Sequence, residues 1–488
     1  MSFEDVMRLG QQRGFFFKAA ETYPNSPAGF WDYGPLGVSM RNKLVELWRR
    51  MLVKRDGMVE LDGAQILPRQ VFEASGHLSG FTDPFVKCAN CGSVFRPDKL
   101  VEEKTGEQIP EKLTDGEYDR LMAEKGVKCP KCGSKLSGTK RFNMMFRVGI
   151  GEQDEEGFLR PETCQSIFVD SPLMFKTQRI KLPVAFAQVG KSFRNEIAPR
   201  QGLLRLRELN QAEVEVFFNP GKLEDHRFQT QLGTRLNFSF PDGSEKTVTA
   251  GEAVESGALP NVLTGHYLSL LVQFYEAAGL EPSNLRLRAL SEKDRAFYAV
   301  AAYDLEAKTS LGWTELVACN YRGDYDMSRH QQVSGSDFRV DDGGEKVLPH
   351  IFEMSMGVDR TVYAIIESST VAESDRRVLR VRPYLAPQQV GVFPLVNKEG
   401  QPEKALSIQR SLLSSFDSFY DGGGSIGRRY ARADEVGVPC CLTVDYDTAK
   451  DDTVTLRERD SKAQTRVKVG DLEAKLRGLL SFPTIPST

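Results

Sequence analysis

Two pairs of cysteines have the spacing of a metal site. Cys88 and Cys91 form one C-x-x-C pair, and Cys129 and Cys132 form a second pair after 37 intervening residues. Each short loop lets two thiolates grip one ion, and two such loops complete a closed tetrahedral site. We therefore predict a structural zinc ion on these four sulfur atoms. Four unrelated free cysteines are the alternative.

A second set of reactive side chains alternates arginine with glutamate in strand-like sequence. Arg194, Asn195 and Glu196 are followed, after a loop, by Arg205 and then by Glu213. On a strand Arg194 and Glu196 point to the same face. One pocket could then offer a guanidinium to a phosphate and a carboxylate to an amino group. A solvated, salt-bridged hairpin is the alternative from spacing alone.

The elements that must position these residues are a mixture of helices and strands. Apolar residues recur every three or four positions from about 36 to 51, which predicts an amphipathic helix. Strands are expected at about 184–189 and 214–218. A G-x-G-x-x-G occurs at 422–427, but it follows a helix rather than a strand, so we expect a loop and not a dinucleotide site.

Composition limits the class of protein. A chain of 488 residues suggests about three folding units. The net charge of −3 excludes a global positive field, so phosphate binding must come from local arginine clusters. Neither an apolar run of membrane-spanning length nor a secretory signal is visible, so we expect a cytoplasmic protein that does not enter a membrane.

The pattern of apolar and polar residues changes near residue 382. Beyond it, short apolar strands alternate with helices, which predicts a compact α/β domain over 383–488. A hairpin is expected at about 453–469 and a last helix near 471. Before the boundary, the lysine- and glycine-rich stretch at about 87–140 carries the cysteine pairs and is interpreted as an insertion. A further insertion is expected at about 221–290.

Three more segments, residues 159–165, 313–316 and 353–360, complete a recognisable pattern. With them the sequence resembles the class II aminoacyl-tRNA synthetases, and within that class the homodimeric glycyl type. The first class signature matches about 36–68, the second begins at Phe193, and the third is Gly-Val-Asp-Arg at 357–360. The glycyl type is marked by Trp-Asp-Tyr-Gly-Pro-Leu-Gly at 31–37. The resemblance covers nearly the whole chain.

The resemblance implies an α+β fold. Its catalytic domain, over 1–382, would be an antiparallel sheet flanked by helices, and 383–488 would be the α/β anticodon-binding domain. The first signature would lie at a homodimer interface. The implied reaction joins glycine to ATP as glycyl-adenylate and then passes the glycyl group to tRNA(Gly).

The resemblance also assigns roles to residues. Arg194 would hold the α-phosphate, Glu196 the adenine amino group, and Arg360 the outer phosphates together with Arg205; the catalytic set is Arg194, Glu196 and Arg360. Glu315 would sit by the ATP-bound Mg²⁺. The full ATP-binding set is Arg194, Asn195, Glu196, Leu204, Arg205, Leu209, Glu315, Leu316, Gly357 and Arg360. The glycine-binding set is Arg96, Glu162, Glu213, Glu353 and Ser355.

The sequence departs from the family at several positions. Leu209 stands where phenylalanine usually stacks on adenine, Met354 and Met356 replace a proline and a small residue, and Cys164 and Ser166 stand where alanine and glycine are common. The charged positions are intact.

Two other functions are weighed against a ligase. One is a catalytically inactive relative that binds nucleic acid as an accessory protein, and the other is a synthetase for another amino acid. The retained phosphate clamp argues against the first and the acidic set against the second. For tRNA binding, basic runs occur at Arg428, Arg429 and Arg432 and at Arg376, Arg377, Arg380 and Arg382. A solvated basic face remains an equal alternative for each run.

Overall fold

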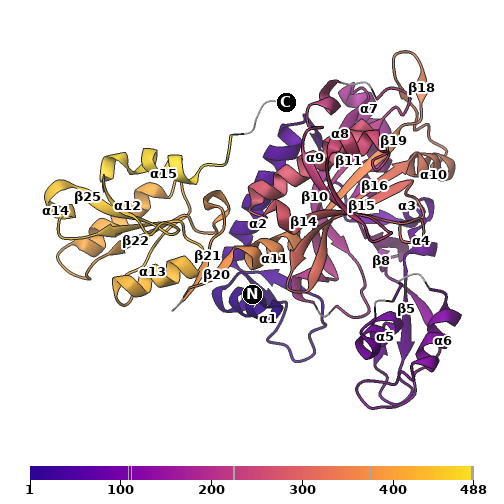
Figure 1. Ribbon diagram of the computed structural model, residues 1–488, viewed down its shortest axis with the longest axis horizontal. Coiled ribbons are helices and arrows are strands. Elements are labelled where there is room, and N and C mark those ends of the chain that lie inside the picture. The colour runs from indigo at the N-terminus through magenta and orange to yellow at the C-terminus, as the bar shows by residue number, and fades with distance from the viewer. Residues whose placement is uncertain (108, 111–112, 200, 224–225, 374–375, 485–488) are drawn as a thin grey trace.

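A nine-stranded sheet forms the centre of the larger part of the molecule (Figure 1). The computed structural model describes residues 1–484 apart from 108, 111–112, 200, 224–225 and 374–375. In spatial order the strands are β13 (Glu245–Thr249), β12 (Arg235–Ser239), β14 (Leu285–Ala289), β15 (Ala301–Thr309), β16 (Gly312–Gly323), β19 (His350–Gly357), β11 (Glu208–Phe218), β10 (Val184–Phe193) and β3 (Val59–Glu60). All pairs from β14 to β10 are antiparallel, and only β12–β14 and β10–β3 are parallel. The predicted antiparallel sheet is confirmed.

Strand alternation separates the two faces of this sheet. On β11, Ala212, Val214 and Val216 belong to the main hydrophobic core, whereas Glu213 and Glu215 point to the opposite face. The core face packs against α2 (Pro35–Trp48), its continuation η1 (Arg49–Lys54), α9 (Val262–Ala278) and α11 (Val358–Ser369). The opposite face is partly covered by α7 (Cys164–Gln178) and α10 (Tyr325–Ser334). The polar face therefore becomes available for a site.

Shorter elements surround the sheet. They are α1 (Phe3–Arg13), β1 (Phe16–Lys18), β2 (Trp31–Tyr33), β4 (Ile66–Pro68), α3 (Arg69–Ala74), α4 (His77–Gly80), β8 (Phe146–Ile150), β9 (Glu155–Leu159), η2 (Gly202–Leu204), η3 (His226–Gln229), α8 (Ala250–Glu255), η4 (Pro282–Asn284), β17 (Val340–Asp341), β18 (Lys346–Val347), β20 (Thr370–Ala372), β21 (Arg377–Leu379) and η5 (Pro383–Leu385). The stretch 221–290, expected as an insertion, supplies β12, β13 and β14, which lie at one end of the nine-stranded sheet. Among the described residues no helix is both long and apolar enough to span a bilayer.

The predicted cysteine insertion folds as a small unit, called here the cysteine module (residues 82–143). It contains β5 (Thr82–Lys87), β6 (Val94–Phe95), α5 (Pro97–Thr105), α6 (Asp115–Glu124) and β7 (Lys140–Asn143). Its own core gathers Val86, Leu100, Val101 and Met122. The antiparallel pair β5–β7 forms the stem that joins the module to the part of the molecule built around the nine-stranded sheet, called the catalytic body after the expectation from the sequence (Figure 1).

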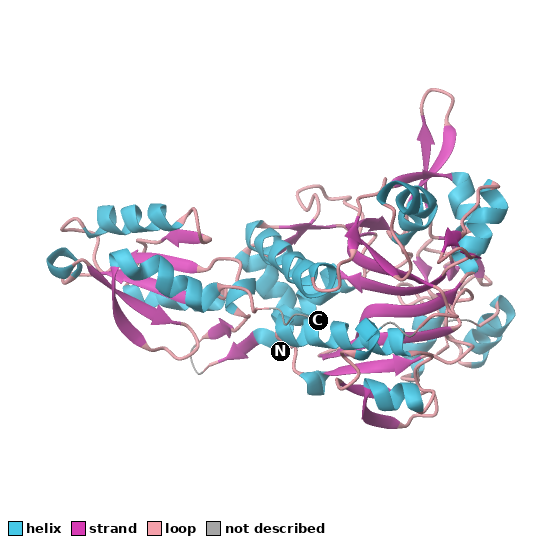
Figure 2. Ribbon diagram, turned by 90° about the horizontal axis from the view of Figure 1, so that it is seen from above, coloured by secondary structure: helices cyan, strands magenta, loops and turns pink. Residues whose placement is uncertain are grey.

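The C-terminal domain lies to one side of the catalytic body (Figures 1 and 2). Its five strands follow the order β23 (Ser418–Tyr420), β22 (Val390–Pro394), β24 (Cys440–Val444), β25 (Thr453–Glu458) and β26 (Gln464–Lys468). Its helices are α12 (Gln401–Leu412), α13 (Ile426–Glu435), α14 (Thr448–Asp451), η6 (Val469–Asp471) and α15 (Leu472–Leu480). Apolar residues of α12 and α15 pack on one face of the sheet and those of α13 on the other. The expected hairpin is the antiparallel pair β25–β26, and the glycine-rich stretch is a loop before α13.

Polar contacts hold the two parts together. Lys43 of α2 forms an ion pair with Asp417. It also donates to the backbone carbonyl of Ala386, which lies in the linker, named here for residues 376–389 ahead of β22. Arg459 of the C-terminal domain donates to the carbonyls of Leu379 and Val381 at 3.0 and 2.8 Å. The linker arginine Arg377 pairs with Asp5 of α1 at 2.9 Å. The linker thus joins both parts through buried and half-buried hydrogen bonds.

Candidate active site

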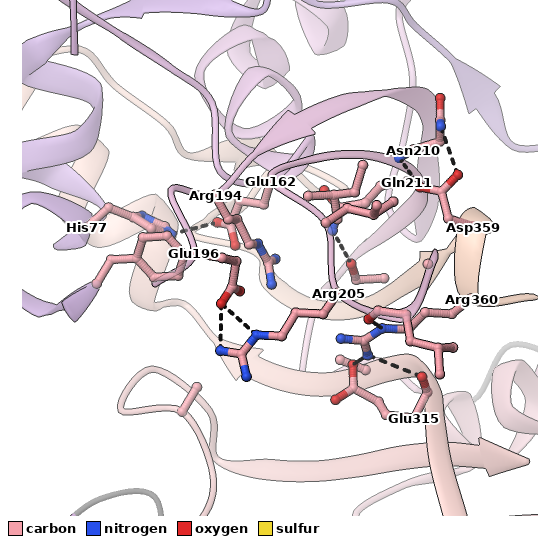
Figure 3. A pocket seen from close by; sticks show the side chains of 18 of the residues that line it. His77, Glu162, Arg194, Glu196, Arg205, Asn210, Gln211, Glu315, Asp359 and Arg360 are labelled. Carbon is pink, nitrogen blue, oxygen red and sulfur yellow. Dashed lines mark hydrogen bonds and ion pairs between the residues drawn. The ribbon is translucent and has the colours of Figure 1, made fainter. Parts of the chain in front are cut away.

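A cavity of about 400 Å³ opens on the polar face of the sheet, where β10, β11, β16 and β19 run side by side (Figure 3). Ten residues of the predicted ATP and glycine sets line it: Glu162, Arg194, Glu196, Leu204, Arg205, Leu209, Glu315, Ser355, Gly357 and Arg360. They come from segments up to 198 residues apart in the chain (162 to 360). The fold therefore brings most of the predicted set to one place.

Arginines paired with carboxylates occupy one end of the cavity. Arg205 donates from Nε to Glu196 at 2.7 Å, and Arg360 donates from Nη1 to Glu315 at 2.9 Å (Figure 3). Arg194 donates to the carbonyl of Pro161 at 3.0 Å, and its guanidinium lies over the Phe81 ring. Each guanidinium is thus held in place before any ligand arrives, which favours binding of an anion at little cost in side-chain entropy.

Asp359 fixes the start of α11, and with it Arg360. Its carboxylate accepts from the backbone N–H and the side-chain amide of Asn210, at 2.7 and 2.9 Å, and from the hydroxyl of Tyr33 at 2.6 Å. Tyr33 belongs to the Trp-Asp-Tyr-Gly stretch that sequence analysis singled out, and burial raises the pKa of its hydroxyl, so the group stays a donor. Asp359 therefore joins the glycyl-type stretch at 31–37 and the third signature to β11.

Glu162 lies on the cavity wall beside Arg194, on the side away from Arg360 (Figure 3). Its Oε1 accepts from Gln165 at 2.8 Å and lies 3.5 Å from Nε2 of His77 (Figure 3). Burial alone would raise the pKa of Glu162, but the His77 imidazole and the Arg322 guanidinium outweigh burial and bring the pKa well below its usual range. Glu162 is thus a fixed negative charge on the cavity wall.

Two more predicted carboxylates lie directly behind the wall. Glu213 accepts hydrogen bonds from the hydroxyls of Ser355 and Thr163, and Glu353 accepts from Arg322 at 2.9 Å and from Asn320 at 2.6 Å. Burial, and then repulsion from Glu162, raises the pKa of Glu213. Burial raises the pKa of Glu353 to about 7, against the opposing pull of Arg322. A cation placed here would find one ionised acid and two more ready to ionise.

Glu215 is a further acid of this cluster that sequence reasoning did not single out. It is fully buried on β11, and neither of its carboxylate oxygens has a hydrogen-bond partner in the described part of the chain. Burial, followed by repulsion from Glu353, raises its pKa well above the usual range. Burial therefore favours the neutral form of Glu215, which has no protein partner for its carboxylate in the described part of the chain.

Several predicted residues lie off the cavity wall. Leu316 and the departures Met354 and Met356 point into the hydrophobic core behind the sheet, as strand alternation requires for both methionines. Asn195 makes a backbone bond to Met144 at 2.8 Å. The family departure that does face the cavity is Leu209.

Arg96 is separated from the rest of the predicted glycine set. It is buried in the cysteine module, where it pairs with Asp83 at 3.0 Å and Asp98 at 2.7 Å. It lines a second recess of about 550 Å³, which shares Arg205 and Glu315 with the cavity but not Glu162.

Sequence reasoning missed other residues of the wall, among them His77, Phe81, Gln211 and Tyr298. Gln211 donates to Glu213 and to Ser355, both at 3.1 Å, and lies two residues before Glu213, so strand alternation could have indicated it. The other three lie in short helices or loops with no periodic pattern. The Arg322 guanidinium carbon lies 3.8 Å from the centre of the Tyr298 ring, so this ring covers the acidic end of the cavity.

The four cysteines of the module converge. Their sulfur atoms all lie within 4.8 Å of one another, and the Sγ atoms of Cys88 and Cys132 are 3.5 Å apart. A zinc tetrahedron with bonds of about 2.3 Å needs sulfur separations of about 3.8 Å. The hydroxyl of Ser134 lowers the pKa of Cys132 to about 6, whereas burial raises that of Cys129 to about 11. The four sulfur atoms can therefore hold one metal ion, which would deprotonate the remaining thiols.

The basic run of α13 divides into two roles. Arg429 is buried and donates to the carbonyls of Pro394, Gly422 and Gly424, so it orders the glycine-rich loop. Arg428 is exposed. In the linker, Arg376 and Arg380 pair with Glu373, which favours a structural role for that run.

Comparison with known proteins gives consistent matches along the chain. Residues 146–237 match the model described as "tRNA synthetase class II core domain (G, H, P, S and T)", and residues 389–479 match "Anticodon binding domain". The glycine–tRNA ligase of Methanothermobacter thermautotrophicus is 35% identical, over 97% of this chain and 99% of that protein. The glycine–tRNA ligase of Thermococcus gammatolerans is 36% identical, over 98% of each chain.

A solved structure is similar in fold. The crystal structure of the RNA binding domain of threonyl-tRNA synthetase from Cryptosporidium parvum aligns with a TM-score of 0.61 and 19% identity, over 98% of this chain and 99% of that chain. At this identity the likeness supports the architecture alone.

Proposed function

This chain belongs to the glycine–tRNA ligases of class II, and from that premise we propose how its cavity activates glycine. The enzyme charges tRNA with glycine in two steps. Glycine and ATP first form glycyl-adenylate and pyrophosphate, and the glycyl group then passes to the 3′ end of the tRNA with release of AMP. The first step forces an anionic carboxylate against an anionic phosphate, so catalysis must neutralise charge and align the reactants.

The arginine end of the cavity is proposed as the ATP site. Arg194 would neutralise the α-phosphate, where the glycine carboxylate attacks, and Arg205 and Arg360 would hold the outer phosphates. The pairs Arg205–Glu196 and Arg360–Glu315 support this assignment, because the phosphates can take over each guanidinium and release its carboxylate. Glu196 would then accept from the adenine amino group.

Magnesium is proposed as the ion that accompanies ATP. It would neutralise phosphate charge, and Glu315, once released from Arg360, is the carboxylate on the wall that would hold it. Leu204, Leu209 and Gly357 would surround the nucleotide.

The acidic end of the cavity is proposed as the glycine site. Glu162 and Ser355 line it, and Glu213 and Glu353 lie behind them, so the ammonium group enters a strongly negative environment. The Tyr298 ring above Arg322 closes the same end. A side chain on the substrate would overlap these walls, and overlap discriminates better than loss of a methylene from a roomy pocket.

Zinc is proposed as the ion of the cysteine module. The convergence of four sulfurs and the lowered pKa of Cys132 support it. A site of four thiolates has no open coordination position, so the ion would be structural.

A homodimer and a cytoplasmic location complete the proposal. A hollow of about 340 Å³ runs along the outer side of α2, between Arg41, Val45 and Arg49 and the neighbouring Val189 and Val358. This hollow lies on the signature that the family places at its dimer interface. Light scattering should report twice the chain mass of 54.6 kDa.

The single observation that carries the proposed function is one cavity whose wall carries three guanidinium groups and the carboxylate of Glu162, with the carboxylates of Glu213 and Glu353 directly behind it. It is tested by ATP–pyrophosphate exchange with the purified protein. Exchange should depend on glycine and not occur with alanine or serine. Equal exchange with alanine would refute the specificity, and no exchange with any amino acid would favour an inactive nucleic-acid-binding relative.

A further inference from the structure

A line of alternating charges runs from the cysteine module to the cavity. Arg96 donates from Nε and Nη2 to the two carboxylate oxygens of Asp98, at 3.0 and 2.7 Å, and from Nη1 to Oδ2 of Asp83 at 3.0 Å. The same oxygen of Asp83 also accepts from Nη2 of Arg205 at 3.4 Å. Nε of Arg205 then donates to Glu196 at 2.7 Å. Five groups thus alternate in sign, and every link is attractive.

The backbone holds Asp83 at a fixed place against Arg205. Asp83 lies near the start of β5, two residues after the cavity residue Phe81, and pairs in register with Phe142 of β7. The carbonyl of Phe81 accepts from the N–H of Met144, and the carbonyl of Met144 accepts from the N–H of Asn195, at 3.0 and 2.8 Å. The stem of the module is therefore bonded to the β10–β11 hairpin loop through the backbone of Met144, which is itself bonded to Phe81 ahead of Asp83.

Arg205 has two carboxylate partners before ATP binds and needs one of them afterwards. Under the proposed function, on which this inference rests, Glu196 leaves Arg205 to bind the adenine amino group. Asp83 then remains as the carboxylate that orients the guanidinium. An arginine side chain without such a partner samples many rotamers, and ordering it on a phosphate costs free energy.

We propose that Asp83 and Arg96 are positioning residues of the ATP site. Asp83 orients Arg205 toward the outer phosphates, and Arg96, which is itself fixed by Asp98, holds Asp83 in place. Arg96 thus acts at the ATP end of the cavity, through Asp83, and does not touch glycine. The cysteine module is by this route a support of nucleotide binding.

The test is steady-state exchange kinetics on the full-length protein with its metal. Asp83→Asn should raise the KM for ATP about tenfold, the loss expected for a charge-assisted hydrogen bond. The kcat and the KM for glycine should stay within about twofold of wild type. Arg96→Met should do the same. Arg96→Lys should be intermediate, because lysine keeps the charge but not the bidentate geometry.

Glu103→Gln is the matched control, because Glu103 is exposed on α5 and lines the same recess. It should leave all three constants unchanged. Metal content and melting temperature are measured for every variant. If Asp83→Asn loses metal or stability, the test passes to Arg96→Lys. The proposal then requires that the KM for ATP rises in Arg96→Lys while the KM for glycine does not.

Two results would overturn the proposal. One is an unchanged KM for ATP in Asp83→Asn or, should that variant lose metal or stability, in Arg96→Lys. The other is a KM for glycine that rises as much as that for ATP, which would return Arg96 to the glycine-binding set. Combining Asp83→Asn with Arg205→Lys gives a further check, since full additivity of the two effects would show that the residues act independently. Failure of the proposed function would look different, because the wild-type protein would then show no glycine-dependent exchange.

Discussion

Glycine offers an enzyme little more than an ammonium and a carboxylate group, so recognition depends on charge placed in a small volume. Glu162 supplies a permanent negative charge, and Glu213 and Glu353 have pKa values raised by burial. Mutual repulsion keeps the acids from ionising together in the free enzyme. An ammonium ion relieves that repulsion, so glycine binding and ionisation of the cluster should be coupled.

The KM for glycine should therefore fall as the pH rises from 6 to 8. Glu353, with a pKa of about 7, is protonated at the lower pH and weakly attractive to ammonium, and it is ionised at the higher pH. A gain of roughly 1 kcal/mol from the added charge corresponds to a decrease of about fivefold in KM. The KM for ATP serves as the internal control and should not follow the same trend. In Glu353→Gln the KM for glycine should be high and should not change with pH. A KM for glycine that does not change across this range would refute the coupling.

Under the proposed function Arg360 acts on charge that develops during the reaction, so its removal should affect activity far more than stability. Arg360→Ala should lower kcat/KM for exchange by at least about 100-fold, the cost of removing one preorganised donor. Circular dichroism should show a melting temperature near that of wild type, because the guanidinium is only half-buried. Ser368→Ala, at an exposed position of the same helix, is the control. Unfolding of Arg360→Ala instead would make this arginine structural.

At the scale of elements, alternation along the strands decides which residues reach the site. The periodic helix at α2, the strands β10 and β11 and the C-terminal hairpin all follow from patterns in the sequence. The same alternation explains why Glu213 and Glu215 face the site while Val214 and Val216 fill the core. Alternation alone left a solvated hairpin as the alternative, and the family resemblance was needed to single out the charged strand residues that the structure brings to the cavity.

Residues that tertiary packing brings to the cavity could not be predicted in this way. His77 follows a glycine with positive φ in a short helix, and Tyr298 lies in a loop of more than ten residues between β14 and β15. Neither segment has a period that marks a buried face. The family resemblance placed Leu316 with its neighbour Glu315 in the ATP-binding set, yet the side chain of Leu316 lies in the core. Adjacent positions on a strand do not share a face.

The cysteine module should depend on its metal. Cys132→Ser should lower the metal content from about one ion per chain to none, because three thiolates seldom retain structural zinc. Limited proteolysis should then cut within residues 87–140 first, since the small core of the module cannot stabilise it alone. Cys440→Ala, in the C-terminal domain, should keep both the metal and the protease resistance. A wild-type protein with far less than one ion per chain would refute the site.

At the scale of the whole molecule, the reaction is divided between two parts. The catalytic body holds the cavity, and the C-terminal domain, similar to anticodon-binding domains, stands to one side of it (Figure 2). Under the proposed function, adenylate formation needs only the cavity, whereas transfer also needs the tRNA, which would contact the C-terminal domain as well. The two steps should therefore respond to different substitutions.

Arg428→Glu tests this division. The side chain is exposed on α13, beside the glycine-rich loop. If Arg428 contacts a phosphate, reversing its charge should lower kcat/KM for charging of tRNA about tenfold. The number of ions released on tRNA binding, measured from the salt dependence of the affinity, should fall by about one. Exchange should not change, because it needs no tRNA. Lys475→Glu makes the same charge change on α15, across the sheet, and should leave both reactions intact. Equal loss of charging in both variants would point to net charge rather than to a contact.

The central claim is that one cavity holds the phosphates of ATP against arginines and the ammonium group of glycine against a cluster of acids at the same time. A crystal structure with a non-hydrolysable analogue of glycyl-adenylate measures this directly. We predict that the phosphorus lies within contact of Arg194, with Arg360 on the same side, and that the amino group faces Glu162. A phosphate remote from both arginines, or an amino group turned away from the acidic cluster, would contradict the account.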